Sequence, residues 1–368
     1  MTRLKSLDIF RGLTVAFMIL VNNGAGDEIY SALKHSQWNG LTPCDLVFPF
    51  FLFIVGMSTY LSLKKTGFKP SKDIYQKIGK RTILLFLIGL GINWFDMICS
   101  GNGLDFAHLR IWGVMQRIAL CYGAVALLVI NINHRYIPHT IVGLLIIYMG
   151  ILTFGNGYAY DSTVNIIASA DYHIFGYDHL YHKSPVDPEG LLSTIPAIAH
   201  TIIGFWCCKN IQRPGQDIAS KIKFLKVAGL IMVVLSFLLS TIGFYINKRI
   251  WSPSYVFVTC GLAAWLLGIL IQIIDHPSTA THNDKDNGSS WFAKGWLAFG
   301  MNPLFLYVMS EMLAIVFGAF GMKESIYDSI HILITDGYLA SLTYALFFVS
   351  IHAVIGIWLY KQRLFIKI

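Results

Sequence analysis

A short polar stretch between two apolar segments holds the side chains best suited to chemistry. His35 lies in this stretch, with Asn22 and Asn23 before it and Trp38 and Asn39 after it. A histidine takes up and returns a proton near neutral pH, so His35 is a candidate general base. Asparagine amides can orient a substrate or stabilise an oxyanion, which makes Asn22 and Asn39 candidate partners. The alternative interpretation is an interfacial loop whose histidine and tryptophan lie at the level of the lipid headgroups.

Asp45 follows closely and has two interpretations. Thr42 and Pro43 precede it, which is the pattern of a helix start with an N-cap, a proline at the first helical position and an acid at the third. A carboxylate also suits the positive end of a helix. The other hypothesis is that Asp45 orients a catalytic group.

Gln116 and Arg117 stand in the first turns of a predicted apolar helix. An arginine at membrane depth needs a partner, because an unpaired charge there is costly. The partner is either a carboxylate such as Glu311 or a phosphate group of a ligand. The residue types do not decide between a structural ion pair and an anion site.

Lys248 and Arg249 form a second pair of unexpected cations. They stand just before a Ser-Pro pair that predicts the start of another helix. The two cations either anchor a loop or bind an anion such as a phosphate or a sugar acid. Glu189, with Asp187, opens a further apolar segment, where helix-start chemistry competes with contact to a substrate.

A tyrosine- and histidine-rich stretch raises the question of a metal site. Its spacing matches no strong ligand pattern, and the six cysteines form no CxxC pair, so we predict no metal. The residues concerned are His173, Asp178, His179 and His182.

The elements that carry these residues follow from composition. Of the 368 residues, 55% are hydrophobic and 13% are charged, whereas a soluble domain has about 25% charged residues. The apolar residues come in blocks of about 18 to 24, long enough to cross a bilayer core of about 30 Å as helices. This pattern excludes a disordered chain, a secreted disulfide scaffold and a soluble enzyme. We expect an all-α integral membrane protein in which residues 1–368 form a single transmembrane domain.

We predict about ten transmembrane helices. The ninth contains Asn302-Pro303, where the missing backbone donor predicts a kink or a broken helix. Residues 325–336 suggest a short re-entrant or interfacial helix. The predicted spans are 7–23, 43–63, 80–97, 111–130, 138–155, 190–208, 222–246, 253–274, 295–320 and 338–360.

The basic residues predict an orientation. Of the 28 lysines and arginines, 21 fall on one side of the predicted spans and seven on the other, whereas the 20 acidic residues split six to fourteen. The positive-inside rule puts the basic side and both termini in the cytoplasm. The short loops and the lack of soluble appendages suggest a plasma (inner) membrane. The exterior side then holds loops of about 24–42 and 156–189, and a polar, flexible cytoplasmic loop covers 275–294. The net charge of +8 reflects these loops and does not predict nucleic-acid binding.

Several blocks of sequence resemble one known family. RLKSLDIFRGLTVAFMILVNN and HSQWNGLTPCDLVFPFFLFIVGMS resemble the start of the membrane core of heparan-α-glucosaminide N-acetyltransferases and their bacterial relatives. LRIWGVMQRIA, DPEGLLSTIPAIAHTIIGF, NKRIWSPSYVFVTCGL and FGMNPLFLYVMS look like later blocks of the same family. The likeness covers nearly the whole chain and leaves a ten-span core, without the large lumenal domain and first span of the animal enzyme.

The resemblance implies transfer of an acetyl group from acetyl-CoA to the amine of a terminal glucosamine. In the family the histidine before Trp-Asn-Gly is catalytic, which is His35 here, and the asparagine ending the preceding span matches Asn22. His35 would act as the base or carry the acetyl group itself, and Asp45 would hold its ring. By residue chemistry we assign to acetyl-CoA binding Arg117, Gln116, Lys248, Arg249 and Asn302, and to sugar binding Asn23, Trp38, Asn39 and Glu189.

Other functions stay open at this point. A permease for amino sugars or N-acetylglucosamine would also need polar residues at membrane depth, although no inverted repeat is evident. An O-acetyltransferase of surface glycans would keep the enzyme class and change the acceptor. The expected partners are the lipid bilayer and an amino-sugar or glycan acceptor, with a homodimer as an open alternative. No cleavable signal peptide is expected.

Overall fold

Helices account for the regular structure of the described part of the chain. The computed structural model describes residues 4–275 and 291–366, and within these ranges it contains helices and no strand. The all-α prediction is therefore confirmed. Of the predicted flexible loop 275–294, residues 276–290 lie outside the described residues, and a helix begins at Trp291.

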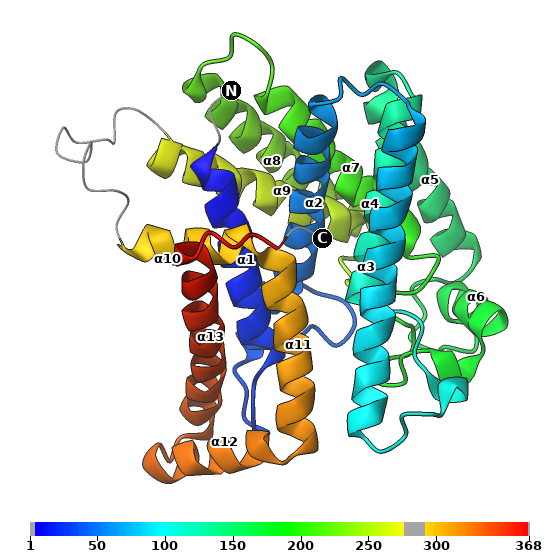
Figure 1. Cartoon of the computed structure of the whole chain (residues 1–368). Coiled ribbons are helices and arrows are strands. Elements are labelled where there is room, and N and C mark those ends of the chain that lie inside the picture. The colour runs from blue at the N-terminus through cyan, green and yellow to red at the C-terminus, as the bar shows by residue number, and fades with distance from the viewer. Residues whose placement is uncertain (1–3, 276–290, 367–368) are drawn as a thin grey trace.

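Figure 1 labels the helices in chain order. A single 3-10 turn, η2 (Pro43–Leu46), directly precedes α2 and matters for the site. The helices are α1 (Lys5–Asn22), α2 (Val47–Lys64), α3 (Lys72–Cys99), α4 (Val114–Asn131), α5 (Ile137–Phe154), α6 (Ile166–Phe175), α7 (Thr194–Ile211), α8 (Ile218–Thr241), α9 (Pro253–Leu270), α10 (Trp291–Met301), α11 (Pro303–Ala319), α12 (Met322–Leu333) and α13 (Gly337–Lys361).

Seven helices of the described residues are long and apolar enough to cross a bilayer: α2 with η2, α3, α4, α5, α8, α9 and α13. The bent pair α10–α11 makes an eighth if it counts as one span. The two other predicted spans, 7–23 and 190–208, correspond to α1 and α7, which have 18 residues each. These two helices carry more polar side chains, such as Asp8 and Arg11 in α1 and His200 in α7. Both run within the same bundle (Figure 1).

The ninth predicted span is broken at Asn302-Pro303, as expected. α10 and α11 meet there at an angle of 88°, and Pro303 begins α11. Asn302 is fully buried; its amide donates to the Leu364 carbonyl at 3.0 Å, and its Oδ1 accepts from the Ile366 N–H at 2.8 Å. The break is therefore tied to the segment that follows α13.

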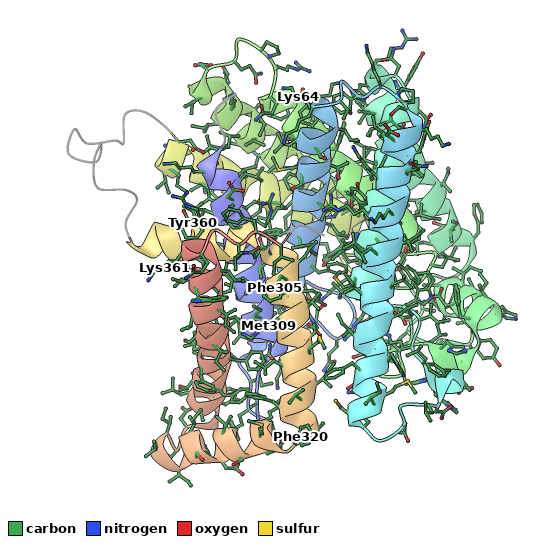
Figure 2. The ribbon with its side chains drawn as sticks, in the orientation of Figure 1. Lys64, Phe305, Met309, Phe320, Tyr360 and Lys361 are labelled. Carbon is green, nitrogen blue, oxygen red and sulfur yellow. The ribbon has the colours of Figure 1, made fainter. Side chains whose placement is uncertain are left out.

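Labelled residues identify the two ends of the bundle. Lys64 marks the end where α2 turns into the basic loop before α3, here called the basic end (Figure 2). Phe320 marks the opposite end, here called the α12 end, where α11 meets α12 (Figure 2). α12 lies across the ends of α11 and α13 (Figure 1), and none of its residues is buried. The short helix expected near 325–336 is thus present, while its position at a membrane surface stays a prediction.

Glycines let α2 and α7 approach each other closely. A side-chain carbon added at Gly56 would lie 1.9 Å from the Thr201 carbonyl oxygen, and one at Gly204 would lie 2.1 Å from the Phe53 carbonyl oxygen. Membrane helices commonly pack through such small residues, because lipid provides no hydrophobic drive between them. This contact fixes α2, and with it the η2 turn that begins the candidate site.

The connection from α1 to α2 returns into the bundle. α3 has 28 residues, whereas η2 and α2 together have 22, so at about 1.5 Å per residue α3 extends roughly 10 Å farther from the basic end. The start of α2 is recessed by a similar amount, and part of the blue connection is visible between α11 and α3 (Figure 1). Cys44 and Asp45, at this start, are buried in the protein.

Candidate active site

His35 and Asp45 form a hydrogen-bonded pair. His35 Nδ1 lies 2.8 Å from Asp45 Oδ1. The other carboxylate oxygen, Oδ2, accepts from the backbone N–H groups of Ser36 and Thr42, both at 3.1 Å, and from the Thr42 hydroxyl at 3.0 Å. One oxygen thus closes the capping box of η2 while the other holds the imidazole. The Asp45 side chain is fully buried, and that of His35 is 38% exposed.

Lys248 is the third member of this cluster. Its Nζ lies 2.9 Å from His35 Nδ1, 3.2 Å from His35 Nε2 and 3.5 Å from Asp45 Oδ1. The Cys44 thiol also borders the ring, with Sγ 3.1 Å from His35 Nδ1. Arg249, next in the chain, makes no hydrogen bond or ion pair with the described residues. From the sequence, Lys248 was interpreted as a loop anchor or as part of an anion site. In the structure its amine lies beside His35.

The pKa of His35 is lowered in this setting. Burial is the largest cause, and the charges of Lys248 and Arg249 add to it, while the hydrogen bond to Asp45 opposes it. Burial also lowers the pKa of Lys248, against the attraction of the Asp45 carboxylate. A neutral imidazole is the form that can take a proton or attack a carbonyl carbon. The cluster therefore favours the reactive form of His35 near neutral pH.

The two loops that carry these side chains are joined by hydrogen bonds. The Asn247 amide donates to Asn39 Oδ1 at 3.2 Å. The Gly40 N–H donates to the Ile246 carbonyl at 2.8 Å. Asn247 is fully buried, and this hydrogen bond gives its side-chain amide the partner that a buried polar group needs. Asn39 therefore holds the loop before α9 against the loop before α2.

Trp38 joins the loop before α2 to the loop 156–189. Its indole N–H donates to the Tyr158 carbonyl at 3.1 Å, and its ring meets the edge of Tyr160 with centroids 5.3 Å apart. The Tyr158 hydroxyl donates in turn to the Tyr245 carbonyl at 3.3 Å. The two loops predicted on the exterior side thus lie against each other and against the connection from α8 to α9.

The two asparagines at the end of α1 differ in accessibility. Asn23 is buried, and its amide donates to the Ile19 carbonyl at 2.7 Å within its own helix. Asn22 is exposed, and its amide donates to Glu311 Oε1 on α11 at 3.3 Å. Asn22 is therefore the one that reaches across from α1 to α11.

Glu189 belongs to a neighbouring ion-pair cluster. Arg110 Nη2 lies 3.0 Å from Asp187 Oδ1 and 2.9 Å from Glu189 Oε2. The Arg110 guanidinium also lies 4.6 Å from the centroid of the Tyr181 ring. Glu189 is within electrostatic reach of Lys248, where its charge favours the protonated amine. The cluster borders the His35 site without a direct contact to the histidine.

Arg117 is fully buried in α4. Its Nη2 donates to the Gly190 carbonyl at 2.8 Å and to the Ser193 hydroxyl. Its guanidinium lies 5.1 Å from the ring of Trp251. It forms no ion pair with a carboxylate of the described residues, so the suggested pairing with Glu311 was wrong. A backbone carbonyl and a hydroxyl, and not a carboxylate, accept hydrogen bonds from its guanidinium group.

Gln116 and Asn302 are enclosed as well. Gln116 packs against the backbone of α3, where a side-chain carbon on Gly89 would come within 2.3 Å of its Oε1. Asn302 holds the segment after α13. Of the five residues assigned to acetyl-CoA, the structure thus brings Lys248 to the histidine, with Arg249 next to it.

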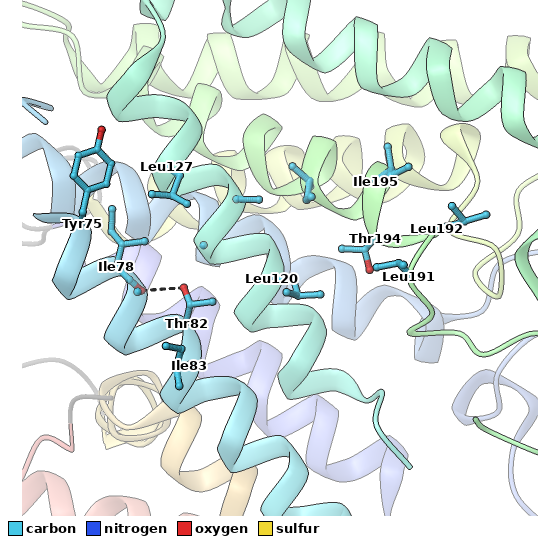
Figure 3. Close-up of a pocket in the computed structure, with 14 residues that line it drawn as sticks. Tyr75, Ile78, Thr82, Ile83, Leu120, Leu127, Leu191, Leu192, Thr194 and Ile195 are labelled. Atoms are coloured by element: carbon cyan, nitrogen blue, oxygen red, sulfur yellow. Dashed lines mark hydrogen bonds between the residues drawn. The ribbon is translucent and has the colours of Figure 1, made fainter. Parts of the chain in front are cut away.

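Two of the hollows among the described helices differ in character. An apolar groove of about 760 Å³ runs between α3, α4 and the start of α7, lined by residues such as Ile83, Leu120 and Leu192 (Figure 3). A hollow of about 330 Å³ lies among α1, α2, α3, α4 and the start of α11, and its lining includes Arg11 and Arg81. Across residues 4–275 and 291–366, no group of three His, Cys, Asp or Glu side chains is arranged to hold a metal ion.

Two features of the site were not foreseen from the sequence. The contact of Cys44 with His35 could not be predicted, since a cysteine in an apolar segment commonly serves packing. The contact between Glu311 and Asn22 was not foreseen either, although a carboxylate in an apolar span is costly and therefore marks a functional candidate.

The membrane-length helices define the class of the protein, an integral membrane protein. The cluster of His35, Asp45 and Lys248 is its candidate active site. Residues 3–222 match the family described as heparan-alpha-glucosaminide N-acetyltransferase, catalytic. The chain belongs to this family, as its sequence blocks predicted.

Two curated relatives support the same assignment. The chain is 30% identical over 365 residues to the heparan-alpha-glucosaminide N-acetyltransferase of Homo sapiens, with 84% of this chain and 53% of that protein covered. It is 31% identical over 367 residues to the protein of the same name from Mus musculus, with 84% and 54% covered. The chain spans about half the length of the curated relatives it matches.

Proposed function

We propose that the protein is a membrane acetyltransferase that moves an acetyl group from acetyl-CoA to the amine of a glucosamine-type sugar. The relatives are named as N-acetyltransferases of a glucosaminide, and the family match includes His35 and Asp45. The observation that carries the proposal is the geometry of His35, which a buried carboxylate holds and an ammonium group borders. Such a cluster supplies a base, an orienting group and a positive charge for an oxyanion.

The reaction needs one acyl transfer and one proton transfer. The amine nitrogen forms a bond to the thioester carbonyl carbon, and the carbon–sulfur bond of acetyl-CoA breaks. The neutral imidazole of His35 takes the proton that the amine loses, and this proton passes to the departing thiolate to give CoA. Asp45 orients the ring and stabilises the imidazolium, and Lys248 stabilises the oxyanion.

His35 can instead carry the acetyl group. In that sequence its ring nitrogen attacks the thioester, CoA leaves, and the amine then attacks the acetyl-imidazole. Incubation with labelled acetyl-CoA and no acceptor separates the two routes, because only the covalent route labels the peptide that contains His35.

The hollow lined by Arg11 and Arg81 suits the phosphates of CoA. Arg81 stacks on the Tyr122 ring 4.5 Å away, and its Nε has no hydrogen-bond partner. Met301 and Pro303, which flank Asn302 in the chain, line the same hollow. Guanidinium groups are good phosphate ligands. The positive-inside rule assigns this part of the bundle to the cytoplasmic half, where acetyl-CoA is made, and His35 to the exterior side.

The other assigned residues serve the two substrates nearer the histidine. Lys248 and Arg249 lie beside His35, where the acetyl group would react. Arg117 and Gln116, which we also assign to acetyl-CoA, are buried in α4. Trp38, Asn39 and Glu189 border the same space, and we assign them, with Asn22, to the sugar. The side chain of Asn23 bonds to its own helix and supports the end of α1.

Mass spectrometry of the products tests this proposal. The purified protein is incubated with acetyl-CoA and a panel of glucosamine, glucosamine oligosaccharides and sugars without an amine. The proposal predicts acetylation of the amino sugars alone, with a product that resists hydroxylamine because it is an amide. A hydroxylamine-labile ester would support the O-acetyltransferase instead. Absence of transfer together with sugar uptake into vesicles without acetyl-CoA would support a permease.

A further inference from the structure

Glu311 is a carboxylate without a counter-cation in an apolar helix. It lies in the middle of α11, the second half of the broken span. The Asn22 amide donates to its Oε1 at 3.3 Å, and the side chain of Tyr307, one turn earlier, is a neighbour of the carboxylate. Among the described residues, no lysine, arginine or histidine forms a salt bridge with it. Most of its acceptor positions are therefore unused.

A carboxylate in this position needs a cation that the described residues do not supply. Neutral donors such as an amide and a phenol satisfy hydrogen bonds but do not cancel the charge. A charge at membrane depth is costly unless it is paired or reached by water, and such residues commonly serve a substrate. Glu311 is only partly buried, so a small solute can reach it.

Glu311 borders the same region as the candidate active site. Asn22 ends α1, and the connection that follows it carries the candidate catalytic histidine. Tyr307 is within electrostatic reach of both Glu311 and Glu189. Glu189 is in turn within electrostatic reach of Lys248. Tyr307 and Glu189 thus lie between Glu311 and the lysine beside the histidine in this series of electrostatic neighbours.

We propose that Glu311, oriented by Asn22, binds the acceptor amine in its ammonium form. The inference rests on the proposed function, since it names the acceptor class of that site as a sugar with a free, cationic amine. A carboxylate and an ammonium group form a charge-assisted hydrogen bond, the strongest kind available here. The bound ammonium loses one proton to water before the amine attacks the thioester, and acetylation then converts the amine into a neutral amide. Glu311 therefore distinguishes the acceptor from the product and favours release of the product.

Binding of three sugars to the full-length protein in detergent tests this site. Thermal-shift titrations compare glucosamine, N-acetylglucosamine and glucose, which differ at one position. The wild type should bind glucosamine about tenfold more tightly than either neutral sugar, as expected for a hydrogen bond to a charged group. Glu311→Gln should bind all three alike. Glu324→Gln, which removes an exposed carboxylate on α12, should keep the wild-type preference.

Kinetics separate a failure of this inference from a failure of the proposed function. Glu311→Gln should raise KM for glucosamine about tenfold, whereas Glu324→Gln should leave this KM unchanged. No transfer by the wild type would overturn the proposed function. Transfer by the wild type, with an unchanged KM and sugar preference in Glu311→Gln, would overturn the inference alone. If Glu311→Gln does not fold, equal affinity of the wild type for glucosamine and glucose overturns it.

Discussion

Removal of the positive charge of Lys248 should raise the pKa of His35. Lys248→Met keeps an unbranched apolar side chain and deletes the ammonium group that lies 2.9 Å and 3.2 Å from the two ring nitrogens. The charge of Lys248 lowers this pKa, whereas the Asp45 carboxylate raises it. Without the lysine the carboxylate acts with less opposition, so the imidazole keeps its proton to a higher pH.

Coulomb's law sets the size of the shift. Two unit charges about 4 Å apart interact by about 1 kcal/mol in water and by about 4 kcal/mol at an effective dielectric constant of about 20. The His35 side chain is 38% exposed, so solvent screens the pair and the lower part of this range applies. Because one pKa unit corresponds to about 1.4 kcal/mol, we expect a rise of about one unit.

The pH dependence of kcat/KM for acetyl transfer measures this shift. A protonated imidazole can act neither as a base nor as a nucleophile, so activity falls on the acid side around the pKa of His35. Lys248→Met should move this acid limb to higher pH by about one unit. Lys183→Met, which changes an exposed lysine of the long loop, should leave it in place. An acid limb that stays or moves to lower pH in Lys248→Met would show that the ammonium group does not act on His35.

Three further predictions follow from single contacts. Asp45→Asn keeps an oxygen near the histidine but loses the charge, so the initial rate of acetyl transfer should fall about 100-fold or more; a near wild-type rate would remove Asp45 from the mechanism. Gly204→Ala puts a methyl group 2.1 Å from the Phe53 carbonyl oxygen, whereas a carbon on Gly143 meets nothing within 4 Å. Only Gly204→Ala should lower the melting temperature, by the equivalent of about 1–3 kcal/mol; equal melting temperatures would contradict the close α2–α7 contact. Burial raises the pKa of Asp171 to about 6, so its contribution to wild-type stability is present at low pH and is lost as pH rises through about 6, by up to about 3 kcal/mol. Melting curves recorded at pH values around 6 should show this loss of stability in the wild type and not in Asp171→Asn. A parallel decline in both proteins would argue against the raised pKa of Asp171.

The helices could be predicted because a bilayer leaves few alternatives. Apolar blocks as long as those of α3 and α8 are typical of membrane spans, and Pro303 marks the break between α10 and α11 by removing a backbone donor. α1 and α7 are less apolar, because charged and polar residues such as Asp8 and Arg11 fall within or near their buried faces. Their place in the bundle depends on packing against α10 and α2, which a linear pattern does not contain.

The site could be predicted only in part. His35 and Asp45 are close in the sequence, so the local pattern was enough to bring them together as a hypothesis. Lys248 lies 213 positions from the histidine, and their contact depends on how the loops before α2 and α9 meet. One partner of Arg117 is the Gly190 carbonyl, a backbone group that every residue carries, so no residue type could signal this contact.

The most direct test of the role of His35 is acetyl transfer by His35→Ala measured beside His173→Ala. His173 is an exposed histidine on α6 whose Nδ1 bonds to the Ser169 carbonyl of the same helix, so its removal controls for the loss of a histidine as such. With labelled acetyl-CoA and glucosamine, His173→Ala should keep the wild-type rate and His35→Ala should fall to background. Wild-type transfer by a folded His35→Ala would contradict the assignment of His35 as the catalytic residue.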